Sequence, residues 1–349
     1  MADPPPEPPR TLRLQIDSGA LAANWRMLDR MSGSAEAGAA VKADGYGLGV
    51  GKVLPALIEA GAREFFVAHW SEVANVLDHA MPAQVSVLHG PLTLEDVAYA
   101  QAVGVRPVIN SLRQAKLWLD AGGRLCDLMV DTGINRLGLP LGEIGDPLVA
   151  QLEIDVLMSH LASADEDNSL NSAQLGRFRE VCAAIPAKRR SLANSAGIAL
   201  GPDYAFDLTR PGLSLYGGVP RPELAGEIRQ VAFPEAAIIQ VRELQPGDSV
   251  GYNATFTATR PMRAGTVSLG YADGILRCWG GKGWLEHEGT KLPLLGKVSM
   301  DMVVVDISAA PGLREGDWLA VPYALPQAAG LTGLSQYELL TVLGERFSR

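Results

Sequence analysis

Short apolar runs alternate with longer segments of helical apolar spacing between residues 39 and 217. The strand-like runs are AAVKA, EFFVAHW, QVSVLHG, VRPVIN, CDLMVDTG, DVLMSHLA, RRSLANS and DLTRPGLSLYG. The helix-like segments between them are residues 49–62, 71–80, 92–104, 111–122, 142–152 and 172–186. Strands that alternate with helices pair in parallel through right-handed crossovers, so the pattern predicts an α/β domain.

The number of strand-like runs distinguishes two parallel architectures. Eight runs match a closed (β/α)8 TIM-like barrel, and an open doubly wound sheet is the alternative. We predict the barrel, although the connection AGIALGPDYAF between the last two runs is too short for a full helix. Residues 111–122 illustrate the helical segments, because Ser111 can cap a helix that Gly122 ends.

The pattern changes after residue 225. The later runs are AAIIQVREL, SVGYNATFTAT, MRAGTVSLGYA, LPLLGKVSM, MVVVDIS and DWLAVPYA, joined by Pro/Gly turns. They predict a mainly β domain, and the final SQYELLTVLGERF is helical, with Ser335 as its cap. We therefore expect a disordered tail over residues 1–11, the barrel over 12–225 and the mainly β domain over 226–349.

Composition excludes several classes of partner. The chain has 349 residues, 47% of them hydrophobic, and a net charge of −9 with no basic block, which argues against nucleic acid or an anionic membrane as partner. No apolar run approaches the roughly 18–20 residues that span a bilayer. The start, MADPPPEPPR, has no secretory signal, and three scattered cysteines fit a reducing cytoplasm. The five histidines show no metal-ligand spacing, so we expect no metal site.

Polar residues fall where a barrel places its chemistry, at the carboxyl ends of strands. Lys42, Arg136 and His160 end or follow three of the predicted strands. A lysine at the end of an apolar strand is either paired or snorkelling, or it is a desolvated amine that can form a Schiff base.

The last two barrel strands carry a second polar group. Asn194, Ser195 and Gly197 follow the seventh strand, and Arg210 and Gly212 lie in the eighth. Loops after these two strands commonly bind phosphate. A reactive lysine, a phosphate cradle that Tyr46 completes and a charged partner for a ring nitrogen together describe a site for pyridoxal 5′-phosphate (PLP).

These residues lie in motifs that resemble those of the alanine racemases, a family of PLP enzymes with a (β/α)8 barrel and a C-terminal β domain. The motifs are AVKADGYGLG, VDTGINRLG, SHLASADE, ANSAG, RPGLSLYG, SLGYADG and GKVSMDMVVVD. They occur in family order between LQIDSGALAANW and YELLTVLGERF, so the resemblance covers nearly the whole chain. It implies an isomerase that interconverts L-alanine and D-alanine and supplies D-alanine for peptidoglycan.

The resemblance also implies roles for individual residues. Lys42 is expected to carry the Schiff base and to act as one base. Tyr271, from the partner subunit of a head-to-tail homodimer, is the opposite base. Arg136, with Met300 and Asp301, is expected to bind the substrate, and Asp165 to lie near it. The residues expected to bind the cofactor are Lys42, Tyr46, His160, Asn194, Ser195, Arg210, Gly212, Leu213 and Tyr337.

Two positions depart from the family pattern. Many members have a lysine at the position of Met129 that orients the substrate arginine, so Asn135 or a bound anion is a candidate for that role here. Lys297 stands where an arginine is usual, which keeps the charge but loses the bidentate fork.

Alternative activities remain open. A serine or broad-specificity racemase shares the same residues. A non-catalytic PLP-binding barrel needs no second domain, so Tyr271 and the Met300–Asp301 pair argue against it. Arg210 disfavours a decarboxylase, because an arginine can only donate to the ring nitrogen and leaves it unprotonated.

Overall fold

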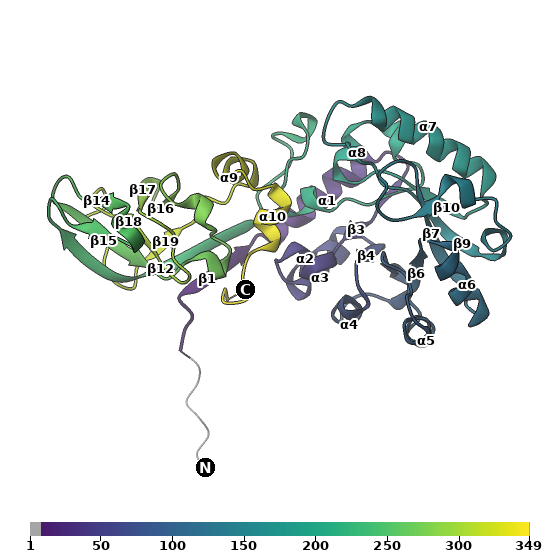
Figure 1. The fold of residues 1–349 in the computed structure, drawn as a ribbon, viewed down its shortest axis with the longest axis horizontal. Helices are drawn as coiled ribbons and strands as arrows, with labels where there is room; N and C mark the ends of the chain where they lie inside the picture. The colour runs from purple at the N-terminus through teal and green to yellow at the C-terminus, as the bar shows by residue number, and fades with distance from the viewer. Residues whose placement is uncertain (1–7, 349) are drawn as a thin grey trace, which may run out of the picture. The chain divides into compact units, whose positions relative to one another are not determined.

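The computed structural model describes residues 8–348, drawn in Figure 1. The chain divides into two compact units. One is Ser18–Arg229, and the other consists of the described residues before Ser18 together with those from Gln230 onward. None of the helices in residues 8–348 has the length and hydropathy needed to cross a membrane.

A parallel sheet forms the centre of the unit Ser18–Arg229. Its strands follow the order β10-β9-β7-β6-β5-β4-β3, and the short β8 pairs with β7. The strands of this unit are β2 (Glu36–Ala37), β3 (Ala39–Ala40), β4 (Phe65–Val67), β5 (Val85–Val87), β6 (Arg106–Ile109), β7 (Leu125–Asp131), β8 (Leu139–Pro140), β9 (Glu153–Met158), β10 (Arg189–Ser191) and β11 (Leu208–Thr209).

Backbone hydrogen bonds close this sheet into a barrel. The strand β11 pairs in parallel with β2, which leads directly into β3. Between β10 and β11, Asp207 N donates to Arg190 O over 3.0 Å and Arg210 N donates to Ala193 O over 2.8 Å. The predicted TIM-like barrel is therefore confirmed over the open sheet, and the eight strand-like runs correspond to its strands when β2 and β3 count as one.

Helices lie between successive strands of the barrel, except between β7 and β9 (Figure 1). The predicted cap at Ser111 is confirmed, because its side chain accepts from Gln114 N. The helices of this unit are α1 (Ser18–Met31), α2 (Lys42–Tyr46), α3 (Val50–Ala60), α4 (Val73–Leu77), α5 (Leu94–Val103), α6 (Leu112–Asp120), α7 (Ser169–Ala184) and α8 (Ser195–Ala199).

The prediction of a helix over residues 142–152 is wrong. This segment forms two short 3₁₀ turns, Leu141–Glu143 and Val149–Gln151. Gly142, Gly145 and Pro147 lie within it, and glycine and proline weigh against a continuous helix more than the apolar spacing favours one.

The second unit is mainly β, as predicted. Its sheet runs β1-β12-β15-β18-β17-β16-β19, and β12 also pairs with β19, which closes a barrel of six strands. Its elements are β1 (Leu12–Ile16), β12 (Ala232–Leu244), β13 (Ser249–Val250), β14 (Phe256–Thr257), β15 (Met262–Val267), β16 (Trp284–His287), β17 (Thr290–Leu295), β18 (Val303–Asp306), β19 (Trp318–Ala320), α9 (Leu325–Thr332) and α10 (Gln336–Thr341). Ser335 caps α10, as predicted, but the helix ends at Thr341 and does not continue through VLGERF as the sequence predicted.

The boundaries of the two units differ from the sequence-based ones. The segment Leu12–Ile16, expected in the first domain, pairs antiparallel with the start of β12 and so joins the β-rich unit. Residues 1–7 of the expected disordered tail lie outside the described residues. Within the rest of that segment, Arg10 Nη1 donates to the carbonyls of Glu345 and Phe347.

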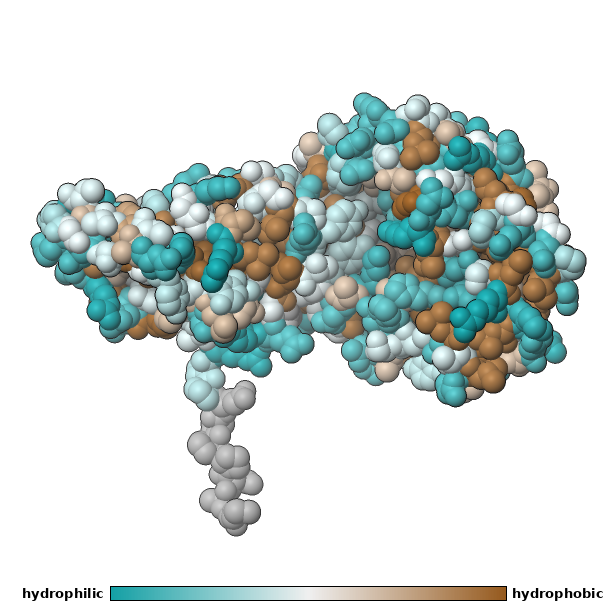
Figure 2. All heavy atoms as spheres, in the orientation of Figure 1, coloured by the Kyte–Doolittle hydropathy of each residue, from teal (hydrophilic) through white to brown (hydrophobic). Residues whose placement is uncertain are grey.

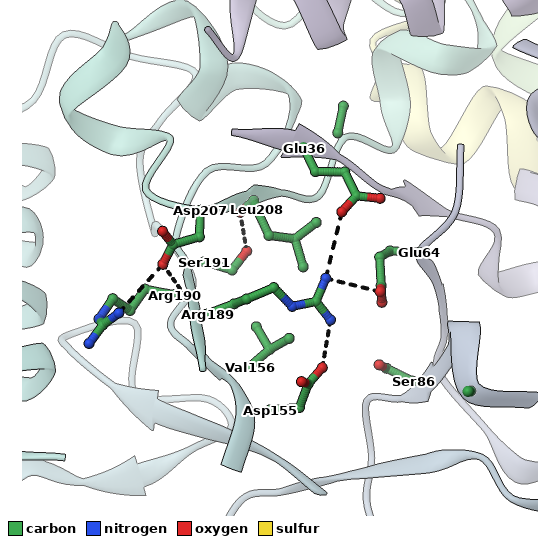
Figure 3. A network of polar contacts seen from close by, with 12 residues as sticks. Glu36, Glu64, Ser86, Asp155, Val156, Arg189, Arg190, Ser191, Asp207 and Leu208 are labelled. Carbon is green, nitrogen blue, oxygen red and sulfur yellow. Dashed lines mark hydrogen bonds and ion pairs between the residues drawn. The ribbon is translucent and has the colours of Figure 1, made fainter. Parts of the chain in front are cut away.

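Charged side chains fill the barrel where its strands begin, the end opposite Lys42. Figure 3 shows the Arg189 guanidinium between three acids. Its nitrogens lie 2.5 Å from Asp155, 2.9 Å from Glu64 and 3.7 Å from Glu36. Arg106, from β6, pairs with the other oxygen of the Glu64 carboxylate.

Asp127 is the most deeply buried acid of this network. It accepts from Ser86 Oγ over 2.6 Å and from Val156 N over 3.1 Å, and its Oδ1 lies 3.5 Å from Arg106 Nε. Burial raises the pKa of Asp127 in spite of these contacts. The interior of this end of the barrel is therefore held by ion pairs as well as by apolar packing.

Candidate active site

A turn of unusual backbone geometry follows Lys42. Lys42 begins α2 directly after β3, and Ala43, Asp44, Gly45 and Tyr46 all have φ between 52° and 64°. This left-handed region costs roughly 1–2 kcal/mol for each residue other than glycine. Strained backbone of this kind persists only where its surroundings hold it.

Burial and charge act on the half-buried Lys42 amine. Burial lowers the pKa of Lys42, and the positive charge of Arg136 lowers it further, while Glu72 acts in the opposite direction. More of the amine is therefore neutral at a given pH than for an exposed lysine. A neutral amine is the nucleophilic form.

Tyr46, Ser195 and Gly212 meet at one place. Tyr46 is buried and its ring stacks on Tyr216 with a centroid distance of 4.7 Å. A Cβ atom on Gly212 would lie 2.2 Å from the Tyr46 hydroxyl, so only glycine fits there. The hydroxyl of Ser195 accepts from the backbone nitrogens of Gly212 and Ser214, over 2.9 Å and 3.2 Å.

The neighbouring residues Leu213, Asn194 and Ser214 extend this cluster. Leu213 is buried at the start of a 3₁₀ turn, Leu213–Tyr216. Asn194 accepts from Gly197 N over 2.8 Å and so caps α8. The hydroxyl of Ser214 is buried and has no hydrogen-bond partner among the described residues. Buried polar groups are rarely left unpaired, so this hydroxyl indicates a ligand or water beside it.

Burial and charge also shift the pKa values of Arg210 and His160. Arg210 is buried, and its two terminal nitrogens donate to Ser191 Oγ and Ser159 O. Burial lowers the pKa of Arg210 to about 10. Burial also lowers the pKa of His160 to about 3, assisted by the charges of Arg210, Arg136 and Lys42.

The positive charges of Lys42, Arg136 and Arg210 therefore all act on His160 and favour its neutral form. No ion pair within the described residues includes Lys42, Arg136 or Arg210, although the charges of Glu72 and Asp127 act on Lys42 and Arg210 without direct pairing. Such a site favours an anionic ligand, because an anion would reduce the repulsion among the cations.

Asp131 shapes the loop that carries Arg136. Its carboxylate accepts from Gly133 N, Ile134 N and Arg136 N over 2.8 to 3.1 Å. Arg136 is exposed and borders a hollow of about 510 Å³.

The structure also places three other residues that the sequence analysis named. Asn135 has a left-handed φ of 54°. Met129 is buried in β7, and the exposed Asp165 follows β9.

The other predicted residues belong to the β-rich unit. Tyr271 N donates to Ser299 O and Ala272 N donates to Met300 O, both over 3.0 Å. A Cβ on Gly270 would lie 2.2 Å from Met300 O, so only glycine lets these two segments approach this closely. The structure thus brings the backbone of Tyr271 next to the Ser299–Met300 segment, beside Asp301.

Arg346 connects two acids in this region. It donates to both oxygens of the buried Asp273, over 2.7 and 2.9 Å, and to Asp301 over 2.7 Å. Asp273 in turn accepts from Gly270 N, directly before Tyr271. Tyr337 is partly exposed on α10. The predicted residues therefore form two groups, one in each unit.

Family models match both units in chain order. The model described as "Alanine racemase, N-terminal domain" matches residues 16–220, and "Alanine racemase, C-terminal domain" matches residues 231–349. The chain belongs to the alanine racemase family. This confirms the resemblance on which the predicted residue roles depend.

Individual alanine racemases are similar over almost their full length. The chain is 42% identical to alanine racemase of Methylobacterium nodulans, covering 97% of this chain and 95% of the relative. It is 41% identical to the biosynthetic alanine racemase of Agrobacterium fabrum, covering 97% and 93%. The structure of alanine racemase from Bartonella henselae with covalently bound pyridoxal phosphate matches with a TM-score of 0.90 and 35% identity, covering 98% of this chain and 99% of that one.

Sequence reasoning missed several residues that hold this alanine racemase site together. Asp131 stands inside the quoted VDTGINRLG motif, so an aspartate before a glycine-rich turn was an available signal. Glu72 and Arg346 act across long sequence separations, on Ala43 and on Asp273. Ser214 also lies inside a quoted motif, RPGLSLYG, but its residue type alone gave no reason to single it out.

Proposed function

We propose that this member of the alanine racemase family interconverts L-alanine and D-alanine with PLP as cofactor, and supplies D-alanine for peptidoglycan in the cytoplasm. The observation that carries the proposal is that the charges of Lys42, Arg136 and Arg210 all act on His160, while none of the three is in an ion pair within the described residues. A site with this arrangement fits an anionic cofactor and an amino acid carboxylate together.

The residues present fit the cofactor. Ser195, Gly212 and Leu213 would hold its phosphate with Tyr46 and Tyr337, and Asn194 would support the same cluster. The close approach of Gly212 to the Tyr46 hydroxyl and the unpaired Ser214 hydroxyl support a ligand there. When bound, PLP acidifies the Cα–H bond of an attached amino acid by delocalising its electron pair. Lys42 would hold the cofactor covalently, with His160 packed against its ring.

Two side chains would move protons. Lys42 Nζ would take or return the Cα proton on one face, and the hydroxyl of Tyr271 from a second copy would act on the other. Free lysine and tyrosine side chains titrate at roughly pH 10, so a neutral-pH base requires a lowered pKa. Burial and Arg136 act in that direction on the pKa of Lys42.

Other residues would orient the substrate and limit side reactions. Arg136 would bind the substrate carboxylate, with the backbone of Met300 and the Asp301 carboxylate nearby. Arg210 can only donate, and Ser191 and Ser159 fix its guanidinium. A donor at the ring nitrogen disfavours transamination and decarboxylation.

The proposed enzyme is a homodimer with shared sites. Apolar side chains are exposed beside the Tyr271 segment, among them Met300 and Met302, which are 52% and 42% exposed. Figure 2 shows apolar residues on the surface of the β-rich unit as well. Exposed apolar side chains around a predicted shared site support association with a second copy.

A chiral assay tests the function. Purified protein with PLP is incubated with L-alanine, L-serine and larger L-amino acids, and each D-enantiomer is measured. We expect D-alanine to form fastest and Lys42→Ala to form none. Equal rates on serine would indicate a broad-specificity racemase, and cofactor binding without racemisation would indicate a PLP-binding protein.

A further inference from the structure

The left-handed turn after Lys42 is held from outside its own segment. Ala43 and Asp44 adopt φ values of 53° and 52°, which side chains other than glycine disfavour. Within the turn, Gly45 N donates to Val41 O and Gly47 N to Ala43 O. These bonds leave the Ala43 nitrogen for a partner elsewhere, and that partner is a carboxylate.

Glu72 provides this carboxylate. Its Oε1 accepts from Ala43 N over 2.6 Å, and its Oε2 accepts from Ala68 N over 2.7 Å and from His69 N over 3.1 Å. Ala68 and His69 directly follow β4, the neighbour of β3 in the barrel. One side chain therefore ties the turn beside Lys42 to the end of the next strand.

The charge of Glu72 also acts on the Lys42 amine. Glu72 forms no ion pair with an arginine or lysine within the described residues, so its charge is shared among three backbone N–H groups and the field at Lys42. Arg136 destabilises the Lys42 cation and Glu72 stabilises it. The other titratable groups that face Lys42 are His89 and His160, and the pKa of each is lowered by burial.

We propose that Glu72 is a positioning residue for Lys42. Its carboxylate fixes the left-handed turn on which Lys42 stands, and it places a negative charge near the amine. The inference rests on the role proposed above for Lys42, and it adds to that role a group that sets both the orientation and the protonation of the lysine.

Three variants separate the two effects. Glu72→Gln keeps the size but removes the charge, and its amide nitrogen cannot accept a hydrogen bond. Glu72→Asp keeps the charge but is too short to reach Ala43 and Ala68 together. Asp96→Asn is the matched control, because Asp96 also accepts from two backbone nitrogens, Leu92 N and Thr93 N, at the start of α5.

The first measurement is the pH dependence of Lys42 labelling. Cofactor is removed, the amine is acetylated over a pH series, and the Lys42 peptide is quantified by mass spectrometry, with return of cofactor binding as the check on folding. Loss of a nearby negative charge lowers an amine pKa, so the labelling midpoint of Glu72→Gln should fall by roughly half a pH unit or more. Glu72→Asp and Asp96→Asn should stay near wild type.

The second measurement is the rate at which the full enzyme releases PLP into a scavenger. Glu72→Gln and Glu72→Asp should both release it at least about threefold faster, because the turn loses charge-assisted bonds. An unmoved midpoint in Glu72→Gln, an equal shift in Asp96→Asn, or wild-type release from Glu72→Asp would overturn the proposal. Neither readout requires racemisation, so a failure of the proposed activity would be seen separately.

Discussion

His160 illustrates how a single partly buried side chain makes stability depend on pH. Burial and three nearby cations lower the pKa of His160 to about 3, whereas an unfolded histidine titrates near 6.5. Unfolding therefore takes up a proton below about pH 6.5. The stabilising contribution is fully present above that pH and is lost as the pH falls toward the folded-state value.

We expect His160→Gln to reduce this acid sensitivity. Between pH 7.5 and pH 5 the wild type should lose about 2 kcal/mol more unfolding free energy than the variant, because a tenfold change in a protonation equilibrium corresponds to about 1.4 kcal/mol. Urea unfolding at both pH values measures the difference. His79→Gln, at an exposed position, is the control, and identical pH dependence in wild type and His160→Gln would contradict the account.

A second residue-scale prediction concerns Gly212. A methyl group there would lie 2.2 Å from the Tyr46 hydroxyl and 3.3 Å from Ala40 Cβ. Gly212→Ala should therefore displace Tyr46 and weaken PLP binding by about tenfold or more, as measured by equilibrium titration. Gly176→Ala is the control, since nothing lies within 4 Å of its Cβ, and equal affinities in both variants would contradict the prediction.

The positions of the predicted site residues at strand ends follow from the sequence, and the residues that support them do not. Lys42, Arg136 and His160 fall at strand ends, which barrel topology brings to one face. Glu72 holds the turn after Lys42 through backbone contacts across 29 positions, and a sequence pattern contains no sign of such a contact.

At the scale of elements, prediction succeeded where periodicity was continuous. The eight barrel runs and the cap at Ser111 are confirmed. The helix predicted over residues 142–152 does not form, because the glycines and the proline disfavour a helix more than the apolar spacing favours one. The segment Leu12–Ile16 belongs to the other unit because it pairs with β12. The sequence contains no sign of this pairing, because β12 lies more than 200 residues further along the chain.

The charged layer inside the barrel belongs to this scale, because it links several strands. Arg106 of β6 contacts Glu64, Asp127 and Asp155. Removing one partner of a buried ion pair leaves uncompensated charge and costs about 3–5 kcal/mol. Arg106→Met should lower the unfolding free energy by that amount.

An exposed ion pair provides the comparison for this prediction. Arg260, which pairs with Asp306 over 2.9 Å, is 58% exposed. Arg260→Met should cost less than about 1 kcal/mol. Urea unfolding of both variants measures the difference. Equal losses of unfolding free energy in Arg106→Met and Arg260→Met would contradict the prediction that unpaired buried charge carries the larger cost.

At the scale of the whole molecule, the proposed site requires two subunits. Lys42 and Tyr271 lie in different units of the chain, and the proposal pairs each Lys42 with Tyr271 of the partner subunit. Lys42→Ala and Tyr271→Phe homodimers should each be nearly inactive. After mixing and subunit exchange, half of the dimers should contain one intact site, which would restore roughly a quarter of wild-type activity.

This complementation is measured with the chiral assay before and after exchange. A double variant, Lys42→Ala with Tyr271→Phe, mixed with wild type is the control for subunit exchange itself. No recovery in the mixed single variants, with proven exchange, would show that both groups come from one chain.

The most direct test of the two-base account is deuterium exchange at Cα, measured separately from L-alanine and from D-alanine in heavy water. The account predicts that Tyr271→Phe greatly slows exchange from one enantiomer and leaves exchange from the other largely intact, because Lys42 still serves its own face. Equal loss of exchange from both enantiomers would contradict the assignment of Lys42 and Tyr271 to opposite faces.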